Sequence, residues 1–278
     1  MSDTTVLVLG ATGKAGRRIT PRLRMRGLTV RAASRTSPTP FDWSNPGGWD
    51  AALRGADAVY VVPPAVPGPV HQLVARAIAT GVQRLVLQSG HGADVWGDTA
   101  FGRDMLSAED AVRASNLEWT VLRAANFNQN FDEELWHAPL VQGELALPAG
   151  SVPEPFIDLE DVADVATAVL MEPGRHDGRI YELTGPRALT FAEAVEVVSV
   201  ASGLPMTYRQ ISPQEYTDAL TQGGLPLEVA HHVSEMFVMM ARGVIAQTTE
   251  DVSAVLGRSP RSFEEYAVRA AASGAWRR

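Results

Sequence analysis

A glycine-rich turn near the start of the chain has the spacing of a phosphate-binding loop. Residues 10–16 read G-A-T-G-K-A-G and follow an apolar run at 5–9. The first glycine permits a tight turn, the second lets the backbone approach a pyrophosphate, and the third lets the next helix pack closely. Free N–H groups at the start of that helix would bind the phosphates. An ordinary glycine turn is the alternative, but the pattern favours a dinucleotide site with contacts from Gly10, Thr12, Gly13, Lys14, Ala15 and Gly16.

Residues at the end of the second predicted strand indicate which dinucleotide binds. An NAD site usually has an acid about 20 residues beyond the turn, which binds the ribose 2′-hydroxyl. Here residues 31–36 read R-A-A-S-R-T, and the first acid is Asp42. Arg35 with Ser34 suits a 2′-phosphate through charge-assisted hydrogen bonds, with Lys14 as a second positive charge nearby. The sequence therefore favours NADP(H) over NAD(H), with Asp42 and Trp43 beside the adenine, although Arg35 could instead be a solvated loop residue.

One histidine is placed to give a proton. Ligands of open α/β sheets bind outside the carboxyl ends of the strands, and the nicotinamide is expected over the ends at 89–91 and 123–127. His91 lies at the first of these ends, and reduction of a carbonyl or quinone by hydride needs a proton donor that titrates near neutrality. Asn126 is suited to bind the nicotinamide amide or a substrate oxygen. A polar loop residue is the alternative for His91, and a loop cap for Asn126.

The same strand ends supply the remaining predicted contacts. Aromatic and amide side chains there would make a pocket for a flat substrate, with core packing as the alternative for each aromatic residue. The predicted substrate contacts are His91, Trp96, Phe127, Asn128 and Trp136, and the further cofactor contacts are Val62, Pro63, Ser89 and Gly90. We expect no metal site.

Alternating strands and helices must position these residues. Strand patterns at 5–9, 28–33, 56–62, 84–88 and 119–122 alternate with helical patterns at 14–26, 70–80 and 103–115. Such alternation predicts βαβ units and a doubly wound parallel Rossmann sheet over residues 1–155, which later strands could rejoin. Beyond residue 131 helical patterns prevail at 160–171, 190–203, 225–244 and 262–272, with a strand at 180–183 and capping boxes at Thr190 and Ser212. We expect a smaller, helix-rich substrate lobe over residues 156–278.

Composition narrows the class of protein. The chain has 278 residues, 24 basic and 32 acidic side chains, a formal charge of −8 and no cysteine. These values exclude a disulfide framework and a cysteine nucleophile and argue against a general nucleic-acid or anionic-membrane binder. No apolar run approaches the ~18–20 residues of a membrane span, and no room for a signal peptide precedes the first apolar run. We expect a cytoplasmic protein that binds a small molecule, with a homodimer possible.

Several segments together resemble a known family. They are G-A-T-G-K-A-G-R at 10–17, S-G-H at 89–91, W-T-V-L-R-A-A-N-F-N-Q-N-F at 119–131, and three later segments at 155–170, 181–198 and 248–266. In this order they resemble the NmrA-like branch of the atypical short-chain dehydrogenases, nearly from end to end. The resemblance implies a Rossmann-type domain with a small C-terminal substrate lobe. It also implies an NAD(P)H-dependent reductase of quinones, azo dyes or triphenylmethane dyes, or a regulator that binds the dinucleotide without turning it over.

Two departures from the family pattern bear on the chemistry. The superfamily usually uses a Tyr-x-x-x-Lys pair, but Lys14 is the only lysine of the chain. Several relatives carry His or Lys four residues before the glutamate that matches Glu109, and this chain has Met105 there. The sequence favours an NADPH-dependent reductase of a small conjugated substrate such as a quinone or enone. A non-catalytic NADP(H) sensor and an isomerase or epimerase with bound NAD(P) are the alternatives.

Overall fold

The computed structural model describes residues 4–64, 66, 68–97 and 99–277. Its main element is a seven-stranded parallel sheet in the order β3-β2-β1-β4-β5-β6-β8. The strands are β1 (Thr5–Leu9), β2 (Thr29–Ser34), β3 (Thr39–Pro40), β4 (Ala58–Val61), β5 (Arg84–Gly90), β6 (Glu118–Ala124) and β8 (Arg179–Leu183). The predicted doubly wound Rossmann sheet is confirmed. Because the strand order reverses at β1, a ligand crevice is expected beside the carboxyl ends of β1 and β4.

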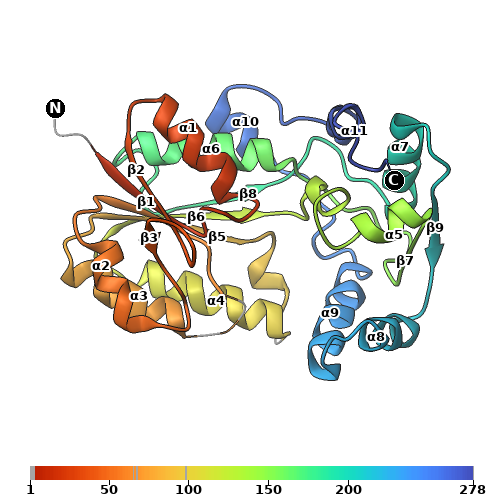
Figure 1. Cartoon of the computed structure of the whole chain (residues 1–278), viewed down its shortest axis with the longest axis horizontal. Helices are drawn as coiled ribbons and strands as arrows, with labels where there is room; N and C mark the ends of the chain where they lie inside the picture. The colour runs from red at the N-terminus through yellow and green to blue at the C-terminus, as the bar shows by residue number, and fades with distance from the viewer. Residues whose placement is uncertain (1–3, 65, 67, 98, 278) are drawn as a thin grey trace.

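Helices cover both faces of this sheet, as Figure 1 shows. On one face lie α1 (Gly16–Met25), α6 (Leu159–Met171) and α10 (Asp251–Leu256), and on the other lie α2 (Trp49–Leu53), α3 (Pro69–Ala79) and α4 (Ala100–Arg113). Side chains of β1 alternate between the two layers, since Val6 and Val8 pack in one core and Leu7 and Leu9 in the other. The sheet is therefore buried on both faces, which suits its near-continuous apolar strands.

A smaller lobe lies beside the carboxyl ends of the strands (Figure 1). It contains α5 (His137–Gln142), β7 (Glu144–Leu147), α7 (Phe191–Ser202), β9 (Thr207–Gln210), α8 (Pro213–Gln222), α9 (Leu227–Met240) and α11 (Phe263–Ala272). Phe131, Phe156 and Phe191 pack together in its own core. The parallel pair β7–β9 was not predicted, because each strand is only four residues long.

The two cores do not divide the chain at a single point. The helix α6 and the strand β8 pack with the main sheet, whereas α5 and β7 pack in the smaller lobe. Segments on both sides of residue 155 therefore share each core. The predicted capping boxes at Thr190 and Ser212 are confirmed. The first helix begins at Gly16 rather than Lys14, because residues 10–15 form the turn itself.

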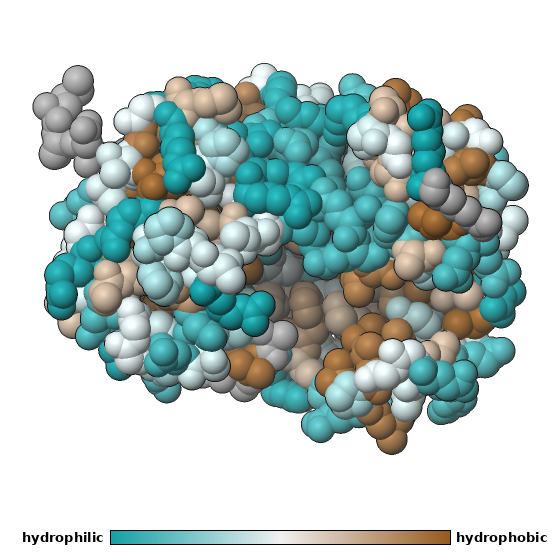
Figure 2. All heavy atoms as spheres, in the orientation of Figure 1, coloured by the Kyte–Doolittle hydropathy of each residue, from teal (hydrophilic) through white to brown (hydrophobic). Residues whose placement is uncertain are grey.

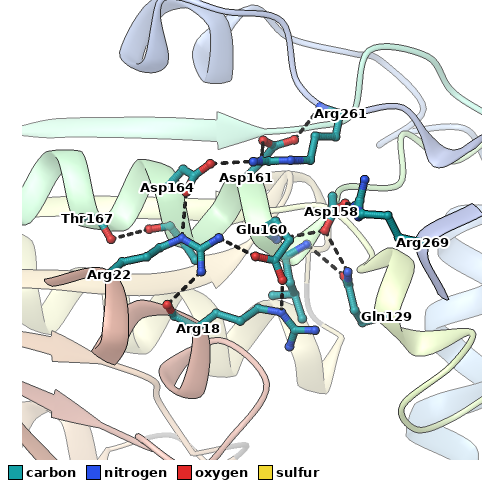
Figure 3. Close-up of polar contacts among 12 residues, drawn as sticks. Arg18, Arg22, Gln129, Asp158, Glu160, Asp161, Asp164, Thr167, Arg261 and Arg269 are labelled. Atoms are coloured by element: carbon teal, nitrogen blue, oxygen red, sulfur yellow. Dashed lines mark hydrogen bonds and ion pairs between the residues drawn. The ribbon is translucent and has the colours of Figure 1, made fainter. Parts of the chain in front are cut away.

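A cluster of arginines and carboxylates joins α1, α6 and the segment that ends in α11 (Figure 3). Its members, called the arginine–carboxylate cluster below, are Arg18, Arg22, Asp158, Glu160, Asp161, Asp164, Arg258, Arg261 and Arg269. Arg18 Nε lies 2.7 Å from Glu160 Oε1, and Arg22 Nε lies 2.8 Å from Asp164 Oδ1. The cluster therefore ties both lobes to α6. Within the described part of the chain, no helix has the length and hydrophobicity needed to cross a bilayer.

Candidate active site

A cleft of about 640 Å³ opens beside the glycine turn, where β1 and β2 end. It brings together most of the residues predicted to bind the adenosine half of a dinucleotide. Its lining is Gly10, Thr12, Gly13, Ser34, Arg35, Thr36, Phe41, Asp42 and Trp43. Residues from two separate stretches of the sequence therefore face one cleft at the expected edge of the sheet.

The geometry of the turn fits a pyrophosphate. Gly10 has a φ of +66°, which favours glycine, and a Cβ on Gly16 would lie 2.3 Å from the Gly10 carbonyl oxygen. Helix α1 starts there with no side-chain cap and no acidic residue in its first turn, so the positive end of its dipole is not neutralised by a carboxylate of its own first turn. Ala15 and Gly16 are buried beneath the turn rather than lining the cleft, which leaves Thr12 and Gly13 exposed on its surface.

Arg35 is exposed in this cleft. Among the residues that the structure describes, no hydrogen bond or ion pair engages its guanidinium. Asp42 instead accepts hydrogen bonds from the Ser44 backbone N–H at 2.8 Å and from the Ser44 hydroxyl at 2.7 Å. These bonds, together with the nearby positive charge of Arg35, lower the pKa of Asp42, while Trp43 packs edge-on against Phe41. The guanidinium of Arg35 is therefore free to bind a phosphate.

Lys14 does not stand beside Arg35 as predicted. Its Nζ donates to Asn130 Oδ1 at 2.7 Å, lies 2.9 Å from Glu134 Oε2, and sits 5.6 Å from the centroid of the Phe127 ring. The side chain points to Asn130 beyond the end of β6 and lines a second cavity. Arg35 therefore lines the first cleft and Lys14 lines the second cavity, so the two cations lie at different ends of the site.

The second cavity, of about 290 Å³, lies beyond the ends of β4, β5 and β6. It is lined by Lys14, Val62, Pro63, Gln88, Ser89, Gly90, His91, Trp96, Phe101, Met105, Ala124, Ala125, Asn126, Phe127, Asn130, Leu135, Met236 and Ile245. Figure 2 shows the surface hollowed between the two lobes, with hydrophobic residues over the α9 side of the hollow. Its mostly apolar wall with a few polar groups is typical of a small-molecule site.

Two residues predicted to bind substrate lie elsewhere. Trp136 is buried in the core of the smaller lobe, edge-on to Phe131 and Phe191, and does not line this cavity. Asn128 is fully buried, and its amide atoms have no hydrogen-bond partner among the described residues. Their positions four and twelve residues beyond the end of β6 could not distinguish the wall of the cavity from the core behind it.

The His91 ring is held in a fixed orientation at the cavity wall. Its Nδ1 lies 2.6 Å from Glu182 Oε2, and the same oxygen accepts the Gly92 N–H at 3.0 Å. Its Nε2 is buried and has no hydrogen-bond partner among the described residues. This arrangement places one ring nitrogen against a carboxylate and leaves the other for a bound molecule.

Glu182, the partner of His91, also belongs to a network of buried ion pairs. Arg123 donates to both carboxylate oxygens of Glu109, at 2.9 and 2.8 Å, and to Glu182 Oε1 at 2.9 Å. Ser89 Oγ donates to Glu109 Oε1 at 2.6 Å. The hydrogen bonds from His91 and Arg123 lower the pKa of Glu182 despite its burial. Glu182 is therefore an ionised partner for the imidazole, and sequence reasoning missed it.

A second glutamate near the cavity has a different environment. Glu154 is 3% exposed, and the Asn126 amide Nδ2 lies 3.3 Å from its Oε1. Burial raises the pKa of Glu154 to about 8. Asn126 itself lines the cavity, so Glu154, whose neutral form is favoured, contacts a polar residue of the cavity wall.

Comparison with known proteins identifies the family. A family model described as NAD(P)H-binding matches residues 10–173, which include the glycine turn and most of the wall of the second cavity. The chain belongs to this NAD(P)H-binding family. This match is consistent with the resemblance to the NmrA-like branch of the atypical short-chain dehydrogenases.

Individual proteins of similar sequence or fold match almost all of the chain. An NAD(P)H azoreductase of Xenophilus azovorans is 32% identical over 97% of this chain and 99% of its own length. The structure of an NADPH-dependent quinone oxidoreductase from Escherichia coli superposes with a TM-score of 0.80 at 22% identity, covering 95% of this chain and 98% of the other. The negative transcriptional regulator NmrA, in complex with NAD, superposes with a TM-score of 0.77 at 20% identity, covering 99% and 97%. The fold thus serves both reductases and a regulator.

Proposed function

We propose that this NAD(P)H-dependent oxidoreductase uses NADPH to reduce a small, flat, conjugated acceptor such as a quinone or an enone. The observation that carries the proposal is the His91 ring, whose Nδ1 contacts Glu182 while its buried Nε2 has no partner among the described residues. Names of relatives support the same chemistry, since they include an azoreductase and a quinone oxidoreductase.

The chain holds groups for each part of this cofactor. Gly13 and the start of α1 would bind the pyrophosphate, Arg35 and Ser34 the 2′-phosphate, and the wall from Val62 to Gly90 the nicotinamide side. When bound there, NADPH supplies a hydride. The protein must then place an electrophilic acceptor in the cavity and provide a proton, because placement alone accounts for much of the rate of a direct transfer.

His91 is suited to give that proton. Hydride addition brings two electrons to the acceptor and leaves negative charge on its oxygen, and a proton from His91 Nε2 neutralises this charge. The ionised Glu182 accepts the Nδ1–H bond and stabilises the imidazolium that acts as donor. Met105 on α4 also lines the cavity but cannot transfer a proton, so the proposed donor is His91, directly after β5.

The cofactor preference is tested by titrating the protein with NADPH and NADH in wild type and in Arg35→Ala. We expect Arg35→Ala to weaken NADPH binding about 10- to 100-fold, the value of one or two charge-assisted bonds, and to leave NADH binding unchanged. Arg24→Ala, an exposed arginine on α1 away from the cleft, is the matched control. Equal loss of both cofactors in Arg35→Ala, or none, would contradict the assignment of the 2′-phosphate site.

The role of His91 is tested by His91→Gln, which removes the proton and keeps a polar side chain. We expect kcat for quinone reduction to fall about 10²-fold or more, as for loss of a general acid, while NADPH affinity stays within a few-fold. His71→Gln, on the exposed face of α3, is the control. Unchanged kcat in His91→Gln would show that the proton comes from elsewhere.

A further inference from the structure

Lys14 brings a positive charge to the wall of the second cavity. Its Nζ donates to Asn130 Oδ1 at 2.7 Å and lies 5.6 Å from the centroid of the Phe127 ring, and all three residues line the cavity. The lysine side chain is 18% exposed, so most of it is shielded from solvent. The proton donation proposed for His91 does not use this ammonium group.

The wall around Lys14 holds no acid that balances this charge. Among the described residues that line the cavity there is no aspartate, glutamate or arginine, and His91 is the one other ionisable side chain. The carboxylates of Glu109 and Glu182 lie behind the wall, where both pair with Arg123. A cation at a mostly apolar surface is costly without an anionic partner, so this wall favours a ligand with negative charge.

The carboxylate that Lys14 contacts is an exposed one. Glu134 Oε2 lies 2.9 Å from Lys14 Nζ, and the Glu134 side chain is 59% exposed. The next residue, Leu135, is 64% exposed and lines the cavity, so this segment forms the outer rim of the cavity. An ion pair with an exposed partner contributes little, because water screens it and the side chains lose freedom. An anion inside the cavity can therefore replace Glu134 at small cost.

The ammonium group of Lys14 has a donor left for a ligand. It carries three N–H groups, and within the described part of the chain the contacts with Asn130 and Glu134 use two of them. The cavity of about 290 Å³ is at the small end of ligand sites, which limits the acceptor to a small ring system. A ring that packs on Phe127 carries its substituents within reach of Lys14 Nζ.

We propose that Lys14 is a specificity-determining residue that binds an anionic substituent, a carboxylate, sulfonate or phosphate, on the conjugated ring of the acceptor. This proposal rests on the proposed reductase function and narrows its substrate class to anionic quinones or enones. His91 gives the proton, while Lys14 holds the ring by its substituent. Because this charge attracts the acceptor before any hydride is transferred, it lowers KM more than it raises kcat.

The experiment compares two acceptors, naphthoquinone sulfonate and the neutral naphthoquinone menadione, in wild type and Lys14→Met. We expect Lys14→Met to raise KM for the sulfonate about tenfold or more, as for loss of a charge-assisted bond, and to leave KM for menadione within about twofold. Each acceptor is compared with itself across the variants, so the difference between the two reduction potentials cancels. A similar change in KM for both acceptors would overturn the proposal.

Two further variants keep the test decisive if Lys14→Met fails to fold. Glu134→Gln removes the competing carboxylate at the exposed rim, and we expect KM for the sulfonate to fall about two- to threefold with no change for menadione. An unchanged or higher KM for the sulfonate in Glu134→Gln would overturn the proposal. Arg17→Met is the matched control, because Arg17 is 47% exposed, pairs with Glu133 and does not line the cavity. Both KM values should stay as in wild type.

Calorimetry tests the anion site without turnover, with NADP⁺ in excess so that the cofactor site is closed to the probe. We expect naphthalene sulfonate to bind wild type about tenfold more tightly than Lys14→Met, and the neutral naphthol to bind both equally. Such binding without reduction of any acceptor would refute the reductase function while the anion site stands. Weaker NADPH binding in Lys14→Met, with no selectivity between the two probes, would overturn the proposal, because Lys14 would then serve the phosphates of the cofactor.

Discussion

Carboxyl groups in two regions of the molecule have pKa values that are shifted in opposite directions. In the arginine–carboxylate cluster of Figure 3, hydrogen bonds from Arg18 and Arg22 lower the pKa of Glu160 although burial opposes this. At the wall of the second cavity, Glu154 has no cation, and burial raises its pKa to about 8. A glutamate carboxyl is thus favoured as an anion in the arginine–carboxylate cluster and as a neutral acid at the wall of the second cavity.

The difference shows how the chain separates stability from chemistry. The cluster joins α1, α6 and the segment before α11, and its buried carboxylate Asp161 receives three hydrogen bonds from Arg258 and Arg261. The cavity wall instead leaves His91 Nε2 without a partner among the described residues. Buried polar groups that lack a partner are costly, and a ligand in the cavity that His91 lines would supply the partner of this nitrogen.

Removal of a buried anion from the cluster should give the largest effect. In Asp161→Ala the side chain that is 0% exposed is lost, and Arg258 and Arg261 keep only Asp164 as a shared partner. We expect a loss of about 3 kcal/mol in the free energy of urea unfolding, the lower part of the range for broken buried pairs. Asp110→Ala, whose side chain is 69% exposed and 4.0 Å from Arg113, should change stability by less than about 0.5 kcal/mol. Similar values for the two variants would contradict a structural role for the cluster.

Neutralising one glutamate in each region should change stability in opposite directions. The pKa of Glu160 is lowered on folding, so its stabilisation is present above the ordinary glutamate pKa and is lost as the pH falls through the lowered value. Glu160→Gln should therefore destabilise at pH 7, by about 1 kcal/mol because the pair is partly exposed, and have little effect at low pH.

Glu154 has the reverse linkage. Its pKa is raised on folding to about 8, so wild-type stability declines as the pH rises from the unfolded value of 4.5 towards 8. Glu154→Gln should remove this decline and gain stability relative to wild type as the pH rises from 5 to 8. Melting temperatures measured at pH 5, 6.5 and 8 check both variants. A loss of stability in Glu154→Gln that grows with pH would show that Glu154 is ionised in the folded protein.

The salt dependence of stability should also differ between the arginine–carboxylate cluster and the Arg123 network, by a smaller amount than the effects above. Arg22 is 20% exposed in its pair with Glu160, so Arg22→Met should cost about 1 kcal/mol at low ionic strength and less at 1 M NaCl. The pair of Arg123 with the fully buried Glu109 is screened less, and the cost of Arg123→Met should change little with salt. Equal salt dependence would mean that the cluster is buried as deeply as the network behind His91.

Sequence predicted the parts of the site that are local in the chain. The glycine turn, Arg35 and the residues at the ends of β4, β5 and β6 depend on short motifs and strand ends, and the structure brings them to two cavities at one edge of the sheet. Glu182 was missed because its role depends on β8 pairing with β6, where Arg123 lies opposite Glu182. Strand order across such a distance has no local signal.

The direction in which side chains point was the second feature that could not be predicted from the sequence. Lys14 lies in the glycine turn, and its Nζ reaches Asn130, which lies far along the chain beyond β6, and not the neighbourhood of Arg35. Glu154 pairs with Leu189 through its backbone, and its side chain contacts Asn126. Neither contact follows from the spacing of residue types, because both join segments more than 25 residues apart.

The central claim is that the second cavity reduces a bound acceptor with NADPH, and turnover tests it most directly. Purified protein is mixed with NADPH and a panel of quinones and enones, with NADPH oxidation and reduced product both quantified, in wild type and His91→Gln. We predict equal amounts of NADPH consumed and product formed by wild type, and a rate about 10²-fold lower for His91→Gln. Tight NADPH binding without oxidation by any acceptor would contradict the claim and favour a protein that senses the dinucleotide.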